Sequence, residues 1–516
     1  MPIRTLVKKN TYVDSVSLMT VSSRANELVG VHQAFAAMGT PMNKEVLRDL
    51  SLLTEDLEQA DTGDLMLVID TADAERSDGA LEELEALLEH KRPAAGPHEE
   101  TTYKTFSSAV AANAEANLAV ISVNGAYAAR EARQALEAGL HVLLFSDNVA
   151  IEDELALKRL AHDKGLLMMG PDCGTAIING VALCFANAVR RGNIALAGAS
   201  GTGSQEVSVR IDALGGGISQ LIGTGGRDLS EEVGGLMMLD AMRALEADPD
   251  TAVVVLVSKP PAASVEAAMI AEAARMEKPV VVCFLGRSDA APAPPGVTFT
   301  HTTDAAARAA TRLAGASGDR PQPPEPDLAI AEAARTRLHR EQRYIRGLFC
   351  GGTLCDEAMY LALERHADVY SNIQKDPDRR LAAQAPSRAH TFLDLGDDDF
   401  TNGRPHPMID PSTRIARLRQ EAEDPEVAVI AMDFILGYGS HDDPVGAMLP
   451  AIADARERAA ARGRHLEILG YVLGTERDRP RIGEQIDKLR GAGVSIAESS
   501  THLGLLAREL VAEGSA

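Results

Sequence analysis

Residues Ile194-Ala-Leu-Ala-Gly-Ala-Ser-Gly-Thr-Gly203 decide the fold, because an apolar stretch of strand length ends in small residues and then gives way to a helical pattern. A second glycine-rich segment, Gly223-Thr-Gly-Gly-Arg-Asp228, follows one predicted strand later. Glycines between a buried strand and a helix leave backbone N–H groups exposed at the positive end of the helix. Both segments therefore predict a binding site for a phosphate or carboxylate group.

Alternation of strand and helix extends outward from this stretch in both directions. Before it, the pattern predicts strands at 118–123, 141–145 and 166–169 and helices at 126–138 and 151–164; within and after it, strands are predicted near 194–197, 218–222, 253–257 and 280–284. Such alternation builds parallel sheets with helices on both faces. We therefore predict an α/β protein with a Rossmann-like parallel-sheet domain, two flavodoxin-like doubly wound domains and a small α+β N-terminal unit.

Three pairs of similar segments indicate that the doubly wound domain is duplicated. Residues 196–202 match 348–353, residues 246–256 match 421–431, and residues 284–289 match 472–478, in the same order. A period above 100 residues indicates a duplicated domain and not a solenoid. Ligands of such sheets bind beyond the carboxyl ends of the strands, so the two copies are expected to present similar edges to one site.

Composition shifts divide the chain into five predicted segments. These are a small α+β domain (1–92), a Rossmann-type domain (101–190), a flavodoxin-type domain (191–315), a linker rich in Gly and Pro (316–340) and a second flavodoxin-type domain (341–516). Within the first segment, the pattern predicts a strand at 12–22, a helix at 25–38, a strand at 64–70 and a helix at 79–90.

Charge and apolar patterning exclude several classes of partner. The 516 residues carry a formal net charge of −24, which disfavours nucleic acids and anionic membranes because phosphates would be repelled. Apolar runs such as 252–257 are far short of the roughly 20 residues that span a bilayer, and the N-terminus has no signal-peptide core. We expect a cytoplasmic protein with no disulfide framework and no metal site, since the five cysteines lack ligand spacing.

Arg227 and the first glycine segment are the main candidates for binding and chemistry. The N–H groups of Ser200, Gly201 and Thr202 would stabilise negative charge or hold phosphate, although a ligand-free turn is the alternative. The guanidinium of Arg227 would clamp a phosphate or carboxylate, with Asp228 orienting it. The alternative for Arg227 is a surface ion pair with Asp228 or Glu231.

Further candidates lie at other predicted strand ends. Cys173 could be a nucleophile, but packing is favoured because no His is close in sequence to activate it. His406 is the best histidine for proton transfer, against the alternative of a surface loop, and Asp433 could cap the same cleft. The full predicted phosphate- and substrate-binding set is Asn124, Gly125, Gly170, Pro171, Asp172, Cys173, Gly198, Ala199, Ser200, Gly201, Thr202, Gly223, Gly225, Gly226, Gly351, Gly352 and Thr353.

Several of these motifs resemble known families. Met169-Gly-Pro-Asp-Cys-Gly174, residues 198–202, residues 223–228 and Asp248-Pro-Asp-Thr251 resemble the α subunit of succinyl-CoA synthetase over about residues 118–314. Residues 170–180, with Gly215-Gly-Gly-Ile-Ser219 and residues 223–231, resemble the FdrA family more narrowly and over most of the chain. The resemblance implies that 101–190 is a CoA-binding-like domain and that both flavodoxin-type domains are synthetase-like.

Departures from the synthetase pattern narrow the expected chemistry. The phosphate-carrying histidine loop of that family, Gly-His-Ala-Gly, is replaced by Gly286-Arg-Ser-Asp-Ala290, and the next histidine is His301. The family's N-terminal glycine-rich CoA loop has no counterpart in 13–22, and no ATP-grasp segment is visible. The anion-binding frame that remains suits an acyl phosphate or carbamoyl phosphate as well as a CoA thioester.

The FdrA resemblance implies a subunit of an acyl- or carbamoyl-transfer enzyme. Its expected reaction converts oxalurate and phosphate to oxamate and carbamoyl phosphate in allantoin breakdown, together with companion subunits. Phosphate would be a substrate and CoA a possible cofactor. Two alternatives stay open: an acyl-CoA synthetase subunit without a phosphohistidine, and a non-catalytic metabolite-binding subunit.

Overall fold

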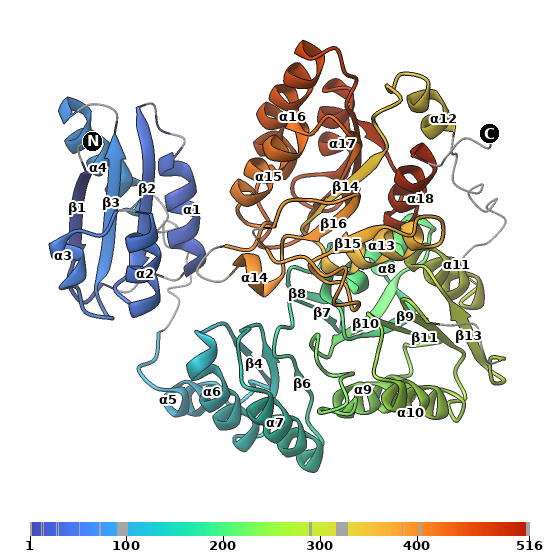
Figure 1. The fold of residues 1–516 in the computed structure, drawn as a ribbon. Helices are drawn as coiled ribbons and strands as arrows, with labels where there is room; N and C mark the ends of the chain where they lie inside the picture. The colour runs from blue at the N-terminus through green and yellow to red at the C-terminus, as the bar shows by residue number, and fades with distance from the viewer. Residues whose placement is uncertain are drawn as a thin grey trace. The chain divides into compact units, whose positions relative to one another are not determined.

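The fold is described from a computed structural model, which covers residues 3–11, 13, 15–26, 28, 30–50, 52–71, 74–89, 102–287, 292–315, 329–383, 385–401 and 405–511. The chain divides into two compact units. The first comprises Met1–Thr102 with Asp398–Ser412, and the second comprises Tyr103–Asp397 with Thr413–Ala516. Figure 1 shows mixed α/β architecture throughout, which confirms the predicted fold class.

The N-terminal unit contains a three-stranded antiparallel sheet in the order β1-β3-β2. Its strands are β1 (Ile3–Lys8), β2 (Val31–Met38) and β3 (Leu65–Thr71), and its helices are α1 (Ser15–Asn26), α2 (Pro41–Asp49), α3 (Glu55–Glu58) and α4 (Ala74–Glu89). The predicted strand at 64–70 and helix at 79–90 are confirmed by β3 and α4, although His90 lies outside the described residues.

Two predictions for this unit were wrong. The segment predicted as a strand at 12–22 is largely helix α1, because Leu18, Val21 and Ala25 are buried at helical spacing. The segment predicted as a helix at 25–38 ends in strand β2, where Ala34 and Ala36 are buried at a spacing of two. Valine, threonine and serine in α1 gave a strand-like composition that core packing overrides.

Residues 118–169 form a three-stranded parallel sheet, β4-β5-β6. The strands are β4 (Leu118–Ile121), β5 (His141–Leu144) and β6 (Met168–Met169), and the helices are α5 (Phe106–Ala112), α6 (Gly125–Glu137) and α7 (Ile151–Lys164). Residues 93–100, between the first two predicted domains, lie outside the described residues, as do residues 316–328 of the predicted linker. Residues 329–335 of that linker form helix α12 (Ala329–Arg335), whose Ala331 and Ala334 are buried.

The first doubly wound domain contains a seven-stranded sheet in the order β13-β12-β11-β9-β10-β7-β8. Its strands are β7 (Thr175–Ile178), β8 (Val181–Cys184), β9 (Arg191–Gly198), β10 (Ile218–Gly223), β11 (Val253–Ser258), β12 (Val280–Phe284) and β13 (Val297–Thr300); its helices are α8 (Gly201–Ala213), α9 (Leu236–Ala247), α10 (Ala263–Ala273) and α11 (Thr303–Leu313). The hairpin β7-β8 pairs antiparallel with β10, so residues 175–184 join this sheet, although we predicted a boundary at 190/191.

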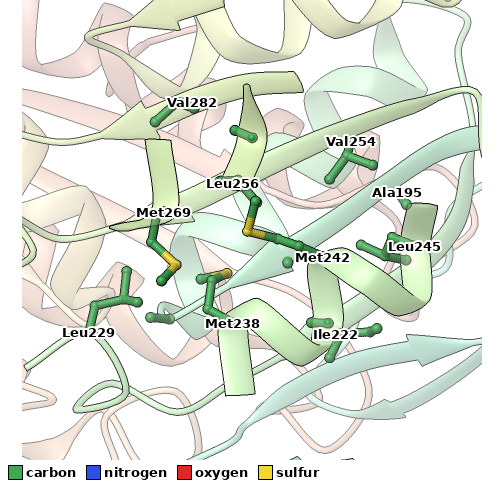
Figure 2. Packing of buried hydrophobic residues seen from close by; sticks show 14 of the residues in the cluster. Ala195, Ile222, Leu229, Met238, Met242, Leu245, Val254, Leu256, Met269 and Val282 are labelled. Carbon is green, nitrogen blue, oxygen red and sulfur yellow. The ribbon is translucent and has the colours of Figure 1, made fainter. Parts of the chain in front are cut away.

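Methionine and branched apolar residues fill one face of this sheet (Figure 2). Met238 and Met242 of α9 and Met269 of α10 pack with Val254 and Leu256 of β11, and all five are fully buried. The central strands are buried on both faces, as parallel sheets require, which explains their continuous apolar sequences.

The second doubly wound domain contains a six-stranded parallel sheet in the order β15-β16-β14-β17-β18-β19. Its strands are β14 (Tyr344–Phe349), β15 (Val369–Ser371), β16 (His390–Asp394), β17 (Val427–Ile435), β18 (Glu467–Leu473) and β19 (Ser495–Ile496). Its helices are α13 (Gly352–Leu363), α15 (Ser412–Glu423), α16 (Pro444–Ala461), α17 (Ile482–Gly491) and α18 (Ser500–Leu510); a short helix, α14 (Asp398–Thr401), lies between β16 and α15 in the chain. The five strands β19-β18-β17-β14-β16 have the same order as β13-β12-β11-β9-β10.

Two equivalent glutamates join the doubly wound domains reciprocally. Glu206 is the sixth residue of α8, and its Oε1 accepts a hydrogen bond from the N–H of Ser500 (3.1 Å) at the start of α18. Glu357 is the sixth residue of α13, and its Oε1 accepts one from the N–H of Thr303 (2.7 Å) at the start of α11. Each domain thus supplies a buried carboxylate that caps the last helix of the other.

Candidate functional site

The two glycine loops of the duplicated domains meet where α8 and α13 begin. The hydroxyls of Ser200 and Thr353 are hydrogen bonded to each other, and the N–H of Thr353 donates to Thr202 Oγ1 (3.4 Å). A Cβ at Gly203 would lie 2.8 Å from Thr353 Cγ2, so only glycine permits this approach. Two positive helix ends therefore converge, as the predicted shared edge requires.

The first loop leaves helix amides available for a ligand. Ser200 is the N-cap of α8, and its Oγ accepts a hydrogen bond from the N–H of Gly203 (3.0 Å). The N–H of Ala199 is used internally, because it donates to Val257 O (3.0 Å). Gly201 and Thr202 are the first two residues of α8, where N–H groups lack an intrahelical acceptor, and Gly201 is exposed. Gly198 allows close packing, since a Cβ there would meet Ser204 Oγ.

The second loop is already occupied by a carboxylate of the chain itself. Asp433 Oδ1 and Oδ2 accept hydrogen bonds from the N–H groups of Cys350 and Gly351, both at 2.8 Å. Asp433 is fully buried, and Arg414 lies 3.3 Å from its Oδ1 while donating to Asp433 O and Leu348 O. The N–H of Gly351 is therefore already used by Asp433, which supports this loop instead of capping an open cleft, and a ligand role for Gly351 stays a prediction.

The loop 223–226 packs against the loop 170–173, as their predicted positions at strand ends suggest. A Cβ at Gly223 would lie 2.5 Å from Cys173 Sγ, and one at Gly225 would lie 2.4 Å from Pro171 O. Gly225 also has a φ of +90°, which favours glycine. Gly226 lies beside Asp172, and Gly170 has a φ of +103°. The two segments form one continuous edge.

Arg227 and Asp228 have different partners from those predicted. Arg227 Nη2 donates to Val149 O (2.7 Å) and lies 2.8 Å from Glu154 Oε2, while 46% of its side chain stays exposed. Asp228 is fully buried and accepts hydrogen bonds from Lys158 Nζ (2.9 Å) and from the N–H of Met238 (2.9 Å) in α9. The prediction that Asp228 orients Arg227 is therefore wrong, because its carboxylate is committed to Lys158 and α9.

Lys158 and Glu154 hold this edge together and were not predicted from the sequence. Lys158 Nζ donates to Glu154 Oε1 (2.7 Å), Asp228 Oδ1 (2.9 Å) and Thr224 O (2.9 Å), so all three of its N–H groups are used. Glu154, Lys158 and Asp228 are fully buried. The sequence shows only that Glu154 and Lys158 are four residues apart on a predicted helix. That spacing is equally typical of an exposed ion pair, so it does not reveal that these residues are buried.

Cys173 is placed for packing and not for nucleophilic attack. Burial raises the pKa of its thiol to about 12, and Sγ lies within hydrogen-bonding distance of Thr175 O and Gly223 O. Burial likewise raises the pKa values of Cys350 and Cys355 well above the ordinary value.

Asn124 and Gly125 begin α6 at the end of β4. Asn124 is exposed, and its Oδ1 accepts a hydrogen bond from the N–H of Ala126 (3.0 Å). A Cβ at Gly125 would lie 2.2 Å from Asp147 O, so glycine is required by close backbone approach. These contacts explain on structural grounds why asparagine and glycine occupy these positions. A ligand role for either residue stays a prediction.

His406 belongs to residues 398–412, which group with the N-terminal unit. Its Nδ1 accepts a hydrogen bond from the N–H of Met408 (3.2 Å) in its own turn. Its role in proton transfer stays a prediction. Residues 288–290 of the segment that replaces the phosphohistidine loop lie outside the described residues.

A lysine and two aspartates lie beside the meeting loops and were also missed. Lys259 follows β11, and its Nζ lies 3.3 Å from Asp356 Oδ2 and 3.8 Å from Asp394 Oδ2. A Cβ at Gly352, the first residue of α13, would lie 2.9 Å from the same Nζ. Because 97 and 135 residues separate Lys259 from the aspartates, no sequence spacing indicates this cluster.

Two other features are absent from the part of the chain that the structure describes. The described residues contain no group of three or more His, Cys, Asp or Glu side chains arranged to hold a metal. Among the same residues, no helix is long and apolar enough to cross a membrane.

Family models match three parts of the chain. A "CoA-ligase" model matches residues 348–510, a "CoA binding domain" model matches 189–286, and an "AllF, heavy metal-associated domain" model matches 1–105. The CoA-binding match thus falls on the first doubly wound domain, whereas we expected it on 101–190. A heavy-metal site does not fit the N-terminal unit, because no cysteine precedes Cys173 and its described residues contain no candidate ligand group.

Individual relatives extend these matches. The uncharacterized protein YahF of Escherichia coli is 58% identical over 514 residues, covering 100% of this chain and 99% of YahF. Subunit alpha 2 of the ADP-forming succinate–CoA ligase of Archaeoglobus fulgidus is 30% identical over 193 residues, covering 36% of this chain and 64% of that subunit.

Among solved structures, the dinucleotide-forming acetyl-coenzyme A synthetase 1 of Ca. Korarchaeum cryptofilum, in complex with phosphate and ADP, is 17% identical. The match covers 86% of this chain and 93% of that one. Its TM-score of 0.31 is too low to support any inference about the site. The family assignment rests on the sequence identity to YahF, which extends over the whole chain, and on the two CoA-related family models. The chain therefore belongs to the same family as YahF, a family of CoA-ligase-like proteins related to the α subunits of succinate–CoA ligases.

Proposed function

We propose that this chain is a subunit of a group-transfer enzyme that binds an acyl or carbamoyl phosphate where α8 and α13 begin. The observation that carries the proposal is the meeting of the two glycine loops, with the amides of Gly201 and Thr202 at an exposed helix end. The narrower FdrA resemblance favours one reaction, in which oxalurate and phosphate give oxamate and carbamoyl phosphate. We propose that the chain acts in this reaction together with companion subunits.

The proposed chemistry needs stabilisation of negative charge and one proton transfer. A phosphate oxygen attacks the carbamoyl carbon of oxalurate, forming a C–O bond, while the bond from that carbon to the oxamate nitrogen breaks. The departing nitrogen takes up a proton. Negative charge that develops on the carbonyl oxygen would be stabilised by the N–H groups of Gly201 and Thr202, which are fixed before the reaction begins.

A CoA-ligase reaction is the second candidate, and the two CoA-related family models favour it. The amides of Gly201 and Thr202 suit a phosphate of CoA as well as a carbamoyl phosphate. Bound CoA would supply a thiol that accepts the acyl group. Gly223–Gly226 and Arg227 would then line the neighbouring edge.

Incubation with defined substrates separates these candidates. The purified chain, alone and with co-encoded partners, is incubated with oxalurate and phosphate, and carbamoyl phosphate is measured; formation of product supports carbamoyl transfer. No product under either condition, together with thermal stabilisation by CoA, would contradict carbamoyl transfer and favour the ligase.

Arg227→Ala tests the proposed anion clamp in whichever reaction is found. We expect about a ten- to hundredfold loss of substrate affinity, since a charge-assisted contact contributes roughly 1.5–3 kcal/mol. Arg243→Ala is the matched control, because Arg243 is also a half-exposed arginine paired with a glutamate. Unchanged affinity and turnover in Arg227→Ala would show that Arg227 is only an ion-pair partner of Glu154.

A further inference from the structure

Lys259 is a half-exposed cation at the junction of the two doubly wound domains. It follows β11 of the first domain, whereas Asp356 lies on α13 and Asp394 ends β16 of the second. Its side chain is 41% exposed, but both aspartate side chains are only 6% exposed. Gly352, next to the loop that contacts Ser200 and Thr202, packs against Asp394 Oδ2. The lysine therefore lies beside the convergent helix ends.

Comparison with Lys158 shows that Lys259 retains unused donor capacity. Lys158 is fully buried and donates three hydrogen bonds of 2.7–2.9 Å, which is the distance expected of charge-assisted bonds. The distances from Lys259 Nζ to its carboxylates are 3.3 and 3.8 Å. Although desolvation opposes it, the charges of Asp356 and Asp394 raise the pKa of Lys259 above its ordinary value, so the ammonium stays protonated.

Asp394 is a carboxyl group that can carry a proton near neutral pH. Burial raises its pKa to about 7, while Lys259 and the N–H of Gly396 act in the opposite direction. Nearby Asp397 and Asp356 raise it further. The other titratable or charged groups around this cluster are Cys350, Cys355, Tyr360, Lys375, Asp433 and Arg414. When Asp394 is protonated, the negative charge beside Lys259 falls by one and a hydrogen-bond donor appears.

We propose that Lys259 and Asp394 form an oxyanion-binding pair next to Gly352 at the start of α13, in which the half-exposed ammonium supplies the charge and the Asp394 carboxyl group a hydrogen bond to a phosphoryl or carboxylate group. Asp356 is a positioning residue, since it holds the ammonium next to Gly352. The inference rests on the proposed function, which places a phosphate- or carboxylate-bearing substrate at these loops. Binding of the anion is then coupled to uptake of one proton, so affinity rises as pH falls through about 7.

Calorimetric titration of the full chain with two anions that do not titrate in this range tests the pair. Sulfate represents a phosphoryl group and oxamate a carboxylate, each at pH 6 and pH 8. We expect at least one of them to bind about tenfold more tightly at pH 6, as one coupled proton with a pKa near 7 requires. Binding of sulfate alone assigns the site to phosphoryl groups, and binding of oxamate alone assigns it to carboxylates.

Three variants separate the two members of the pair from a general charge effect. Lys259→Met should weaken binding at least tenfold at both pH values. Asp394→Asn, which keeps a neutral donor, should abolish the pH dependence while retaining affinity. Lys164→Met, which removes an exposed lysine at the end of α7, should bind like the wild type. Thermal midpoints within a few degrees of the wild type show that the variants are folded.

The proposal is overturned if neither anion binds the wild type, if Lys259→Met binds normally, or if Asp394→Asn keeps the full pH dependence. Failure of the proposed function gives a different pattern. A chain that binds sulfate through Lys259 but forms no carbamoyl phosphate with its partners keeps the oxyanion pair and loses the reaction. If Lys259→Met forms carbamoyl phosphate as well as the wild type does, the reaction stands and the oxyanion pair is lost.

Discussion

The first and second glycine loops have the same strand, loop and helix order but opposite polar surroundings. Val257 pairs with Gly198 at the end of β9, whereas Asp433 occupies the equivalent position of β17 beside the end of β14. The apolar Val257 leaves the first helix end available, whereas Asp433 fills the second loop with a carboxylate. The neighbouring strand thus determines how the N–H groups just before each helix are satisfied: those of Cys350 and Gly351 donate to the Asp433 carboxylate, whereas that of Ala199 donates to Val257 O.

Asp433→Val, which copies the first loop into the second, should have the largest effect. It leaves Arg414 buried without its carboxylate and two loop N–H groups without an acceptor. We expect a loss of about 3–5 kcal/mol of stability, measured by urea or thermal unfolding. Asp250→Val is the matched control, because Asp250 forms an exposed ion pair and should cost less than about 1 kcal/mol. Equal effects of the two changes would remove the distinction between the loops.

Glu206→Gln should change the pH dependence of stability where the two domains meet. Burial raises the pKa of Glu206 to about 7, from an unfolded value near 4.5, although Tyr471 and Ser500 donate hydrogen bonds to it. The folded state therefore binds more protons between these values, and Glu206 lowers stability as pH rises from about 4.5 to 7. The variant should lose this dependence, which amounts to roughly 3 kcal/mol.

Thermal midpoints at pH 5 and pH 8 measure the effect of Glu206→Gln. Glu277→Gln, at an exposed position, is the control. If Glu206→Gln keeps the pH dependence of stability seen in the wild type, another group titrates at this interface.

Gly203→Ala should separate the loops by crowding. The added Cβ would lie 2.8 Å from Thr353 Cγ2 and 2.7 Å from Ser200 Oγ. We expect a cost of roughly 1–3 kcal/mol in thermal unfolding, together with weaker anion binding, because neighbouring groups must shift. Gly491→Ala in α17, where a Cβ meets open space, should be neutral or slightly stabilising. If both variants behave alike, close approach of the loops is not required.

Ser200→Ala should have the smallest effect. It removes the N-cap of α8 and the hydrogen bond to Thr353 but leaves the amides of Gly201 and Thr202 in place. We expect about 1 kcal/mol in stability and less than a tenfold change in anion affinity. Complete loss of anion binding would indicate that the Ser200 hydroxyl, and not the helix amides, is the main ligand group.

Local periodicity predicted the doubly wound domains and the positions of their glycine loops, because buried parallel strands have continuous apolar sequences. It failed at α1 and β2, where composition and packing disagree. The partners of Arg227 and Asp228, and the pairing of Lys259 with Asp394, were not predictable in this way. The ion pairs among these residues join positions 70 or more apart in the chain, and only the folded sheets bring them together.

The central claim is that the first loop binds an oxyanion and the second does not. A crystal structure of the chain with sulfate tests it most directly. We predict sulfate within hydrogen-bonding distance of the N–H groups of Gly201 or Thr202 and of Lys259 Nζ, with Asp433 still bound to Cys350 and Gly351. Sulfate at the second loop with Asp433 displaced, or at neither loop, would contradict the account.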